Sequence, residues 1–275
     1  MAARAIIITP TIPAMATRSD RQGPVFLPGA VLLRTCIALI ALSAVAWGIR
    51  CLPVFQDQSR LEAAKDLILR NVKVSDADLD ALAPLLQRAS DRIDCVPVVD
   101  RSVAIIRLRL AENALSSATD TLDRRLSELD QAIRKSLGCA PTDSYLWLVL
   151  FWVRNNREGL RDDHYDLLRM SYRLGPNEGW IAVKRNAMAL AMFEGLPPDL
   201  ADAAIAEFAR LVKSELYTEA IDLLKGPGWR LRDRLMAGLA GVPERNVGIL
   251  VKAMSDIGYD LDSRAPVERR NRRRI

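Results

Sequence analysis

The sequence contains few of the residues that build catalytic and metal sites. It has a single histidine, His164, and four cysteines, none of them in the C-x-x-C spacing of a zinc or redox site. It also lacks a glycine-rich phosphate loop, a nucleophile elbow and an H-E-x-x-H pair. On a helix, His164 is turned away from the face that Asp163 and Asp166 share, so these three residues do not complete a site. We therefore expect no enzyme activity, no cofactor and no metal.

Aromatic residues and strand signals are also scarce, whereas alanine and leucine are abundant, which favours helices. Apolar residues recur at helical spacing, and the uncharged run 145–153 is too short to cross a membrane. A helix that is apolar on all sides is packed on all sides, so this run predicts a central buried helix. The fold class that we predict is all-α.

Local signals place several helix ends. Ser75, followed by Asp78, is predicted to cap a helix that Pro84 kinks or divides. Asp143 and Ser144 both offer cap residues for the helix over 145–153. Gly175 is predicted to end one helix and Pro176 to lie in the first turn of the next.

One long apolar run, residues 23–49, carries Arg34 as its only charge. Residues 35–49 are uncharged, and adding 31–33 nearly reaches the roughly 20 residues that a bilayer requires, if the Arg34 side chain extends to the headgroups. We predict a signal-anchor helix over 28–50. Arginines outnumber acidic residues before this run, which places the N-terminus in the cytoplasm and the body in the periplasm of a bacterial inner membrane. A cleaved signal peptide, suggested by Ala44-Val45-Ala46, and a buried helix of a soluble protein are the alternatives.

The net charge of +5 is concentrated at the two ends of the chain. Residues 264–275 contain six arginines and one glutamate, residues 1–34 contain four arginines and one aspartate, and the body between them is therefore mildly acidic. A basic groove for nucleic acid is not indicated. The tail could still bind RNA, anionic lipid or acidic polysaccharide electrostatically, and the alternative is a solvated, disordered end. The tail residues concerned are Arg269, Arg270, Arg272, Arg273 and Arg274.

Two cysteines, Cys95 and Cys139, each lie just before a turn that contains proline. In an oxidising compartment they could form a disulfide that stabilises the body by a few kcal/mol. Two buried thiols are the alternative, and the sequence leaves both open.

Two segments of the body share an outline. Residues 137–146 and 173–181 each read as helix end, turn, proline, polar, acidic, small, aromatic and aliphatic, and their prolines, Pro141 and Pro176, are 35 positions apart. This spacing is close to the period of about 34 residues in tetratricopeptide repeats. Over roughly residues 98–213 the chain resembles the tetratricopeptide-like helical-repeat family, which implies an α-solenoid that binds proteins. The layout is also similar to single-span, envelope-anchored helical-repeat proteins that accompany bacterial exopolysaccharide or O-antigen machinery.

These observations combine into one hypothesis. We expect a disordered cytoplasmic segment over 1–27, a transmembrane helix over 28–50, a degenerate tetratricopeptide-like helical-repeat domain over 51–260 and a disordered Arg-rich tail over 261–275. The body would bind a partner protein of the cell envelope, in surface polysaccharide assembly or export, with Trp180 and Trp229 as candidate contact residues unless they belong to the core. A glycan-acting envelope enzyme and a soluble adaptor that binds RNA or anionic surfaces through the tail are the competing hypotheses. The partner's identity, the number of repeats and the oligomeric state do not follow from the sequence.

Overall fold

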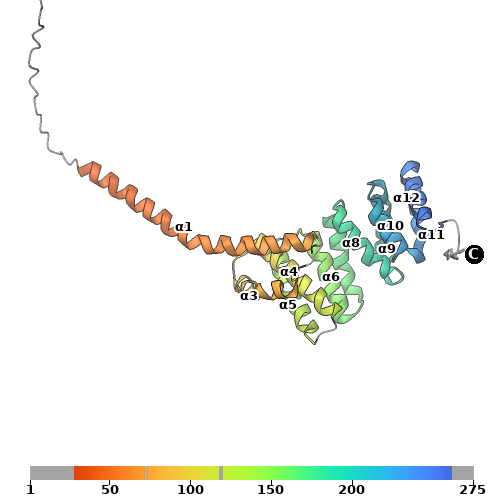
Figure 1. Ribbon diagram of the computed structural model, residues 1–275, viewed down its shortest axis with the longest axis horizontal. Coiled ribbons are helices and arrows are strands. Elements are labelled where there is room, and N and C mark those ends of the chain that lie inside the picture. Colours follow the sequence, from red (N-terminus) through yellow and green to blue (C-terminus); the bar gives the residue numbers. More distant parts are fainter. Residues whose placement is uncertain (1–27, 71, 73, 118–119, 262–275) are drawn as a thin grey trace, which may run out of the picture. The chain divides into compact units, whose positions relative to one another are not determined.

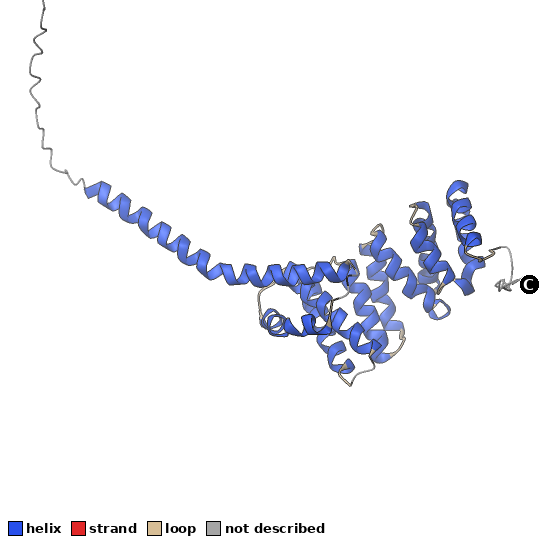
Figure 2. Ribbon diagram, in the orientation of Figure 1, coloured by secondary structure: helices blue, strands red, loops and turns tan. Residues whose placement is uncertain are grey.

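The computed structural model describes residues 28–70, 72, 74–117 and 120–261, and every regular element in these ranges is a helix (Figure 2). The prediction of an all-α chain is therefore confirmed for the part that the structure describes. The chain divides into two units, Met1–Phe55 and Gln56–Ile275. The segment 1–27 and the tail arginines Arg269, Arg270, Arg272, Arg273 and Arg274 lie outside the described residues.

The first long helix, α1 (Pro28–Leu69), begins where the anchor was predicted and continues well beyond its predicted end at residue 50. It belongs to both units, because the boundary between them follows Phe55. The sequence from Ser59 to Asn71 on its own is typical of a separate first helix of the body, and the structure instead continues α1 without a break to Leu69. Pro53 removes one backbone hydrogen bond from α1 but, in the structure, does not end it.

The second unit continues with shorter helices (Figure 1). They are α2 (Asp76–Ala81), α3 (Ala83–Asp91), α4 (Pro97–Ser116), α5 (Leu122–Cys139), α6 (Ser144–Glu158), η1 (Asp162–His164), α7 (Tyr165–Leu174), α8 (Gly179–Ala191), η2 (Phe193–Gly195), α9 (Pro198–Lys213), α10 (Tyr217–Lys225), η3 (Trp229–Leu231), α11 (Arg232–Ala237), η4 (Gly238–Gly241) and α12 (Glu244–Asp256). Consecutive helices pack in pairs, α4 with α5, α6 with α7 and α8 with α9, and α6 also packs on α5 and α8. The middle of the unit is thus a row of helix pairs.

Two hydrophobic cores hold this row together. The first contains Leu61 of α1 and Phe151 of α6, and the second contains Phe208 of α9 and Leu250 of α12; all four side chains are fully buried. Burial of each such side chain stabilises the fold by about 1.5–3 kcal/mol. The helix α6 is buried along most of its length, as predicted, although Trp147 and Trp152 within it are only half-buried.

The helix ends agree with the sequence signals except at one proline. Ser75 caps α2 by accepting a hydrogen bond from the Asp78 backbone N–H at 3.2 Å, and α3 begins at the residue before Pro84, which therefore divides the helix as predicted. The Asp143 carboxylate accepts hydrogen bonds from the first two backbone N–H groups of α6. Pro176, however, lies in a turn three residues before α8 begins, so its predicted place in the first helical turn is wrong.

Candidate protein-binding face

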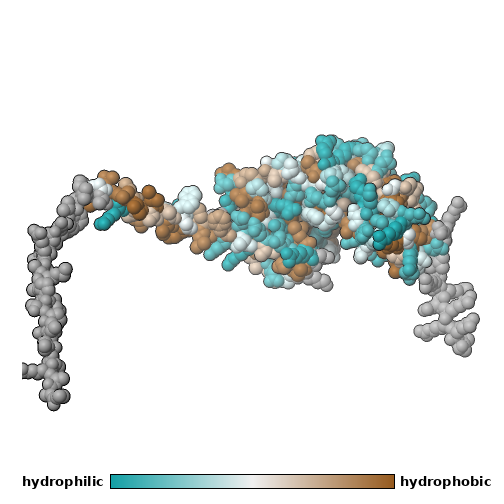
Figure 3. All heavy atoms as spheres, turned by 90° about the horizontal axis from the view of Figure 1, so that it is seen from above, coloured by the Kyte–Doolittle hydropathy of each residue, from teal (hydrophilic) through white to brown (hydrophobic). Residues whose placement is uncertain are grey.

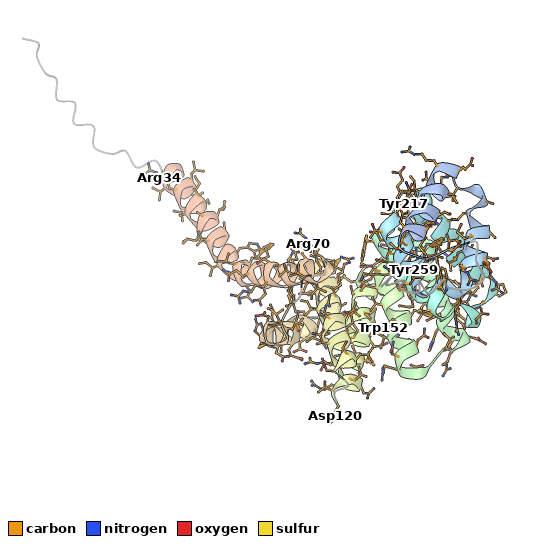
Figure 4. The ribbon with its side chains drawn as sticks, turned by 45° about the vertical axis from the view of Figure 1, so that its right-hand side comes forward. Arg34, Arg70, Asp120, Trp152, Tyr217 and Tyr259 are labelled. Carbon is orange, nitrogen blue, oxygen red and sulfur yellow. A yellow bond between two sulfur atoms is a disulfide. The ribbon has the colours of Figure 1, made fainter. Side chains whose placement is uncertain are left out.

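Side chains from the helices α4, α6 and α8 line a shallow pocket of about 150 Å³. Positions four residues apart lie on the same face of a helix, and each helix contributes at least one such pair. We call this surface the inner face; its residues are Leu108 and Glu112 of α4, Tyr145, Leu148, Val149 and Trp152 of α6, and Lys184 and Met188 of α8. Trp152, labelled in Figure 4, lies near the middle of the row of helix pairs. The surface is therefore mainly apolar and aromatic.

Trp180 extends this face by one helical turn. It precedes Lys184 by four residues on α8, is 42% exposed, and its ring centroid lies 4.8 Å from that of Tyr145. A tilted aromatic pair of this kind contributes about 0.5–1.5 kcal/mol beyond the buried area. The structure therefore presents Trp180, a residue singled out from the sequence, as an accessible aromatic side chain packed against Tyr145.

The inner face has two charged residues, Glu112 and Lys184, and they differ in whether they form an ion pair. Glu112 lies 3.6 Å from the Nε of Arg109, whose Nη2 also donates to the backbone oxygen of Ile68 at 3.5 Å. Lys184 is exposed and forms no ion pair with a residue in the described ranges. Burial, with a further contribution from Glu112, raises the pKa of the Tyr145 phenol, so that this side chain stays neutral.

Trp229, the other candidate contact residue, does not join this face. It is half-buried against the second core, with Tyr259 packed edge-on at a centroid distance of 4.9 Å and the guanidinium carbon of Arg232 5.0 Å from its ring centroid. These contacts use the indole within the C-terminal helices. Trp229 is therefore part of the packing rather than of the inner face.

A larger groove, of about 570 Å³, lies over the opposite side of α6. Its residues come from α5, α6 and the η1–α7 segment and include Trp147, Arg154 and His164. We call it the outer groove. Trp147 and Arg154 lie on the side of α6 that faces away from Tyr145 and Trp152, because α6 turns by about 100° per residue.

The only histidine in the sequence, His164, is buried beside the outer groove with both ring nitrogens occupied. Nδ1 lies 3.0 Å from Oδ1 of Asn155, and Nε2 lies 3.4 Å from Oε2 of Glu158. The hydrogen bond from Arg154 lowers the pKa of the Glu158 carboxyl, and His164 contributes less in the same direction. The described lining residues of the groove include no serine, threonine, cysteine or lysine that could act as a nucleophile. Within the described ranges no cluster of three or more His, Cys, Asp or Glu side chains could hold a metal ion.

The structure joins Cys95 and Cys139 by a disulfide, with their Cα atoms 5.5 Å apart. The sequence left open a disulfide or two buried thiols at these positions, and the structure has the disulfide. Cys36 and Cys51 are free, and both lie on α1. The bridge connects the segment before α4 to the last residue of α5.

Sequence reasoning missed a buried ion pair that joins three helices. Arg185 of α8 and Glu207 of α9 are both fully buried, and Arg185 also donates to the backbone oxygens of Ser171 and Gly175 at the end of α7. A signal was present, because Arg185 follows Ile181 by four residues and precedes Ala189 by four on an apolar face. The assignment of Tyr145 to the core is confirmed, since this side chain is buried in the first core, whereas Trp152 is half-buried against that core and also lines the inner face.

Comparison with protein-family models, curated proteins and solved structures finds no match to this chain.

Proposed function

We propose that the chain is a membrane-anchored helical-repeat protein whose body binds a partner protein through the inner face. The observation that carries this proposal is the exposed Trp180, packed at a tilt against Tyr145 beside an apolar pocket made by three neighbouring helices. Tryptophan and tyrosine are among the side chains that most often dominate protein–protein binding energy.

The stacking of equivalent turns supports the helical-repeat part of the proposal. The helix α6 begins at Ser144 and α8 at Gly179, 35 positions later, and the sequence Glu-Gly-Leu-x-x-Asp occurs at 158–163 and again at 194–199. The two copies lie against each other: a Cβ placed on Gly195 would be 2.9 Å from the Cδ2 atom of Leu160. Likewise, the hydroxyl of Ser144 lies 3.5 Å from a carboxylate oxygen of Glu178. Contacts between corresponding positions of successive units are characteristic of solenoid proteins.

The exposed apolar surface of α1 supports the membrane anchor. The structure describes one helix apolar and long enough to cross a bilayer, and none of its most hydrophobic 18-residue window is buried. Figure 3 shows hydrophobic residues along the N-terminal part of α1, whereas hydrophilic residues cover much of the visible second unit. Leu32, Ile40 and Trp47 are 68%, 67% and 72% exposed, and a continuous apolar surface of this length is stable in lipid rather than in water. The excess of arginine before the helix supports a periplasmic position of the body in this proposal.

The resemblance in layout to envelope-anchored proteins of surface polysaccharide machinery suggests the setting. In this proposal the partner is a protein of that machinery, and the chain acts as a scaffold rather than as a catalyst.

The partner-binding proposal is tested by site-specific photocrosslinking in cells. A benzophenone amino acid replaces Lys184 on the inner face or, as a matched control, Lys252, an exposed lysine on α12. We expect a discrete protein adduct from position 184 that disappears when Trp180→Ala is added, and no such adduct from position 252. No adduct at 184, or an adduct that Trp180→Ala leaves unchanged, would contradict the proposal.

The topology is tested by accessibility of an added thiol. Ser255, exposed in α12, is replaced by cysteine, and a membrane-impermeant maleimide is applied to cells with a permeabilised outer membrane and an intact inner membrane. We expect labelling above that of the unmodified chain, whose free cysteines, Cys36 and Cys51, lie on α1. Labelling that requires lysis of the inner membrane would place the body in the cytoplasm.

A further inference from the structure

A third hollow, of about 460 Å³, lies between the start of α8 and the end of α9. We call it the α8–α9 pocket; its wall includes Gly179 and Ala182 of α8, Arg210 and Lys213 of α9, and Leu216 after α9. Ala182 is two residues from Trp180, so the pocket lies on the side of α8 that faces away from the inner face. Its volume is typical of sites for small molecules, which measure about 300–1,000 Å³.

The α8–α9 pocket corresponds in its place along the chain to the outer groove. Pro141 and Trp147 line the outer groove, and the residues 35 positions later, Pro176 and Ala182, line the α8–α9 pocket. The fold therefore forms two corresponding hollows, and their other side chains decide what each can bind.

The two hollows differ in their charges. In the outer groove, both arginines of the lining bind carboxylates of α5 or α6. In the α8–α9 pocket, Arg210 and Lys213 are exposed, and neither forms an ion pair with a residue in the described ranges. The second hollow is therefore positively charged, whereas the charges of the first are paired.

The carboxylates near these elements do not belong to the lining of the α8–α9 pocket. Glu207, one turn before Arg210, is buried in its ion pair with α8, and Glu178 lies 3.5 Å from the hydroxyl of the first residue of α6. Glu215 and Glu244 are exposed and form no ion pair with a cation in the described part of the chain. The positive charge of the pocket is therefore left without a partner among these residues.

The two cations are not needed to cap α9. Lysine and arginine near the end of a helix often bind its last carbonyl groups, but these carbonyls already have other donors. The backbone N–H groups of Glu215 and Leu216 donate to oxygens in the last turn of α9, each at 3.1 Å. The side chain of the buried Asn246 donates to the backbone oxygens of Val212 and Lys213, each at 3.2 Å. Both cations thus remain available to a ligand.

The rest of the wall favours a ligand with both an anionic and an apolar part. Pro176, Ala182, Leu211 and Leu216 provide apolar surface next to the cations. Gly179 is the first residue of α8, and no side chain caps this end of the helix, so its first backbone N–H groups add to the positive potential.

We infer that the α8–α9 pocket binds a small molecule that carries an oxyanion group, either a phosphate or a carboxylate. The oxyanion lies at Arg210 and Lys213, and the apolar part of the ligand lies against Leu211 and Leu216. Charge-assisted hydrogen bonds of this kind form without breaking an ion pair that the fold already has. The two ends of the chain, residues 1–27 and 262–275, do not supply the oxyanion, because arginines outnumber acidic residues in both.

The test is isothermal titration calorimetry on the full-length chain in a mild detergent, with phenyl phosphate, benzoate and uncharged phenol as the probes. The variant Arg210→Gln/Lys213→Gln removes both cations of the pocket. The matched control, Arg230→Gln/Lys252→Gln, removes two other exposed cations that form no ion pair in the described ranges. A further variant, Ser214→Asp, adds a carboxylate to the pocket lining at an exposed position, and circular dichroism checks that each variant keeps its helices.

We expect phenyl phosphate or benzoate to bind the wild type and the matched control at least tenfold more tightly than phenol does. Binding should weaken at least tenfold in Arg210→Gln/Lys213→Gln and in Ser214→Asp, and the tighter of the two anions identifies the group that the site prefers. The inference is overturned if neither anion binds saturably, or if phenol binds as tightly as they do. It is also overturned if a folded pocket variant, of which Ser214→Asp alone is sufficient, binds as tightly as the control.

Discussion

The buried pair Arg185–Glu207 gives the sharpest test of how the helix row is held together. Both side chains are 0% exposed, and Nη2 of Arg185 lies 2.5 Å from Oε1 of Glu207. Nη1 donates to the backbone oxygen of Ser171 at 2.6 Å, Nη2 to that of Gly175 at 3.0 Å, and the guanidinium lies 4.2 Å from the ring centroid of Tyr172. One side chain therefore links the end of α7, the middle of α8 and the middle of α9.

Replacing Arg185 with methionine keeps similar bulk but leaves the Glu207 carboxylate buried without its partner. Breaking a buried ion pair in this way costs about 3–5 kcal/mol, a large fraction of the roughly 5–15 kcal/mol that stabilises a typical domain. Replacing both residues with methionine removes the unpaired charge as well. The Ser171 carbonyl keeps the backbone hydrogen bond from Gly175 at 3.1 Å, so the Gly175 carbonyl and the Ser171 hydroxyl are the groups that lose a donor. We therefore expect the double variant to be more stable than Arg185→Met alone.

The assay is urea-induced unfolding of the full chain in a mild detergent, followed by circular dichroism. Arg169→Met is the matched control, because Arg169 forms a bidentate but exposed ion pair with Asp199, and exposed pairs contribute about 1 kcal/mol or less. If Arg185→Met lowers the unfolding free energy no more than Arg169→Met does, the pair does not hold the row together. If the double variant is as unstable as Arg185→Met, the argument from the unpaired charge is wrong.

Three further predictions address other contacts of the second unit. Replacing Cys95 and Cys139 with serine opens a loop of about 45 residues, for which chain entropy predicts a loss of about 4 kcal/mol; an unchanged urea midpoint would refute this. In Gly175→Ala the new Cβ would lie 2.1 Å from the hydroxyl oxygen of the first residue of α6, so we expect a loss of about 1–3 kcal/mol in the same assay, and wild-type stability would contradict the packing. Because Arg169 lowers the pKa of Asp199, this carboxylate stabilises the fold above its unfolded pKa of about 3.9 and loses that effect as the pH falls through the lowered folded value. Asp199→Asn should therefore be less stable than wild type at pH 7, with the difference shrinking towards pH 3; a difference independent of pH would refute the assignment.

Local signals in the sequence were enough to place many elements of this fold. The caps Ser75 and Asp143 and the division at Pro84 depend only on residues within one turn, and the structure has all three. The long apolar run likewise predicted α1 from its own composition. The continuation of α1 through Pro53 did not follow, because the part of the helix after this residue is stabilised by the first core, which receives Leu61.

The candidate site was harder to predict from the sequence, because it depends on which faces of separate helices meet. Trp180 could be named as an aromatic side chain near a turn, but its stacking on Tyr145 joins residues 35 positions apart. The partner of Arg185 lies on the next helix, and periodicity shows only that a charge occurs on an apolar face. Trp229 has the same local character as Trp180 and nevertheless packs against the second core.

The charges on the two sides of α6 favour partner binding at the inner face rather than in the larger outer groove. In the outer groove, Arg154 lies 3.3 Å from Asp130 and 2.6 Å from Glu158, and Glu158 also contacts His164. A partner that covered this groove would remove water from several charges that already have their partners, and it would have little new charge pairing to offer in return. Both hollows have apolar and aromatic linings, so the difference between them lies in the charges: on the inner face, Lys184 still lacks an ion-pair partner among the described residues. A partner with an apolar anchor and one carboxylate would gain burial and a new ion pair there at little desolvation cost, which favours the inner face although its pocket is the smaller of the two.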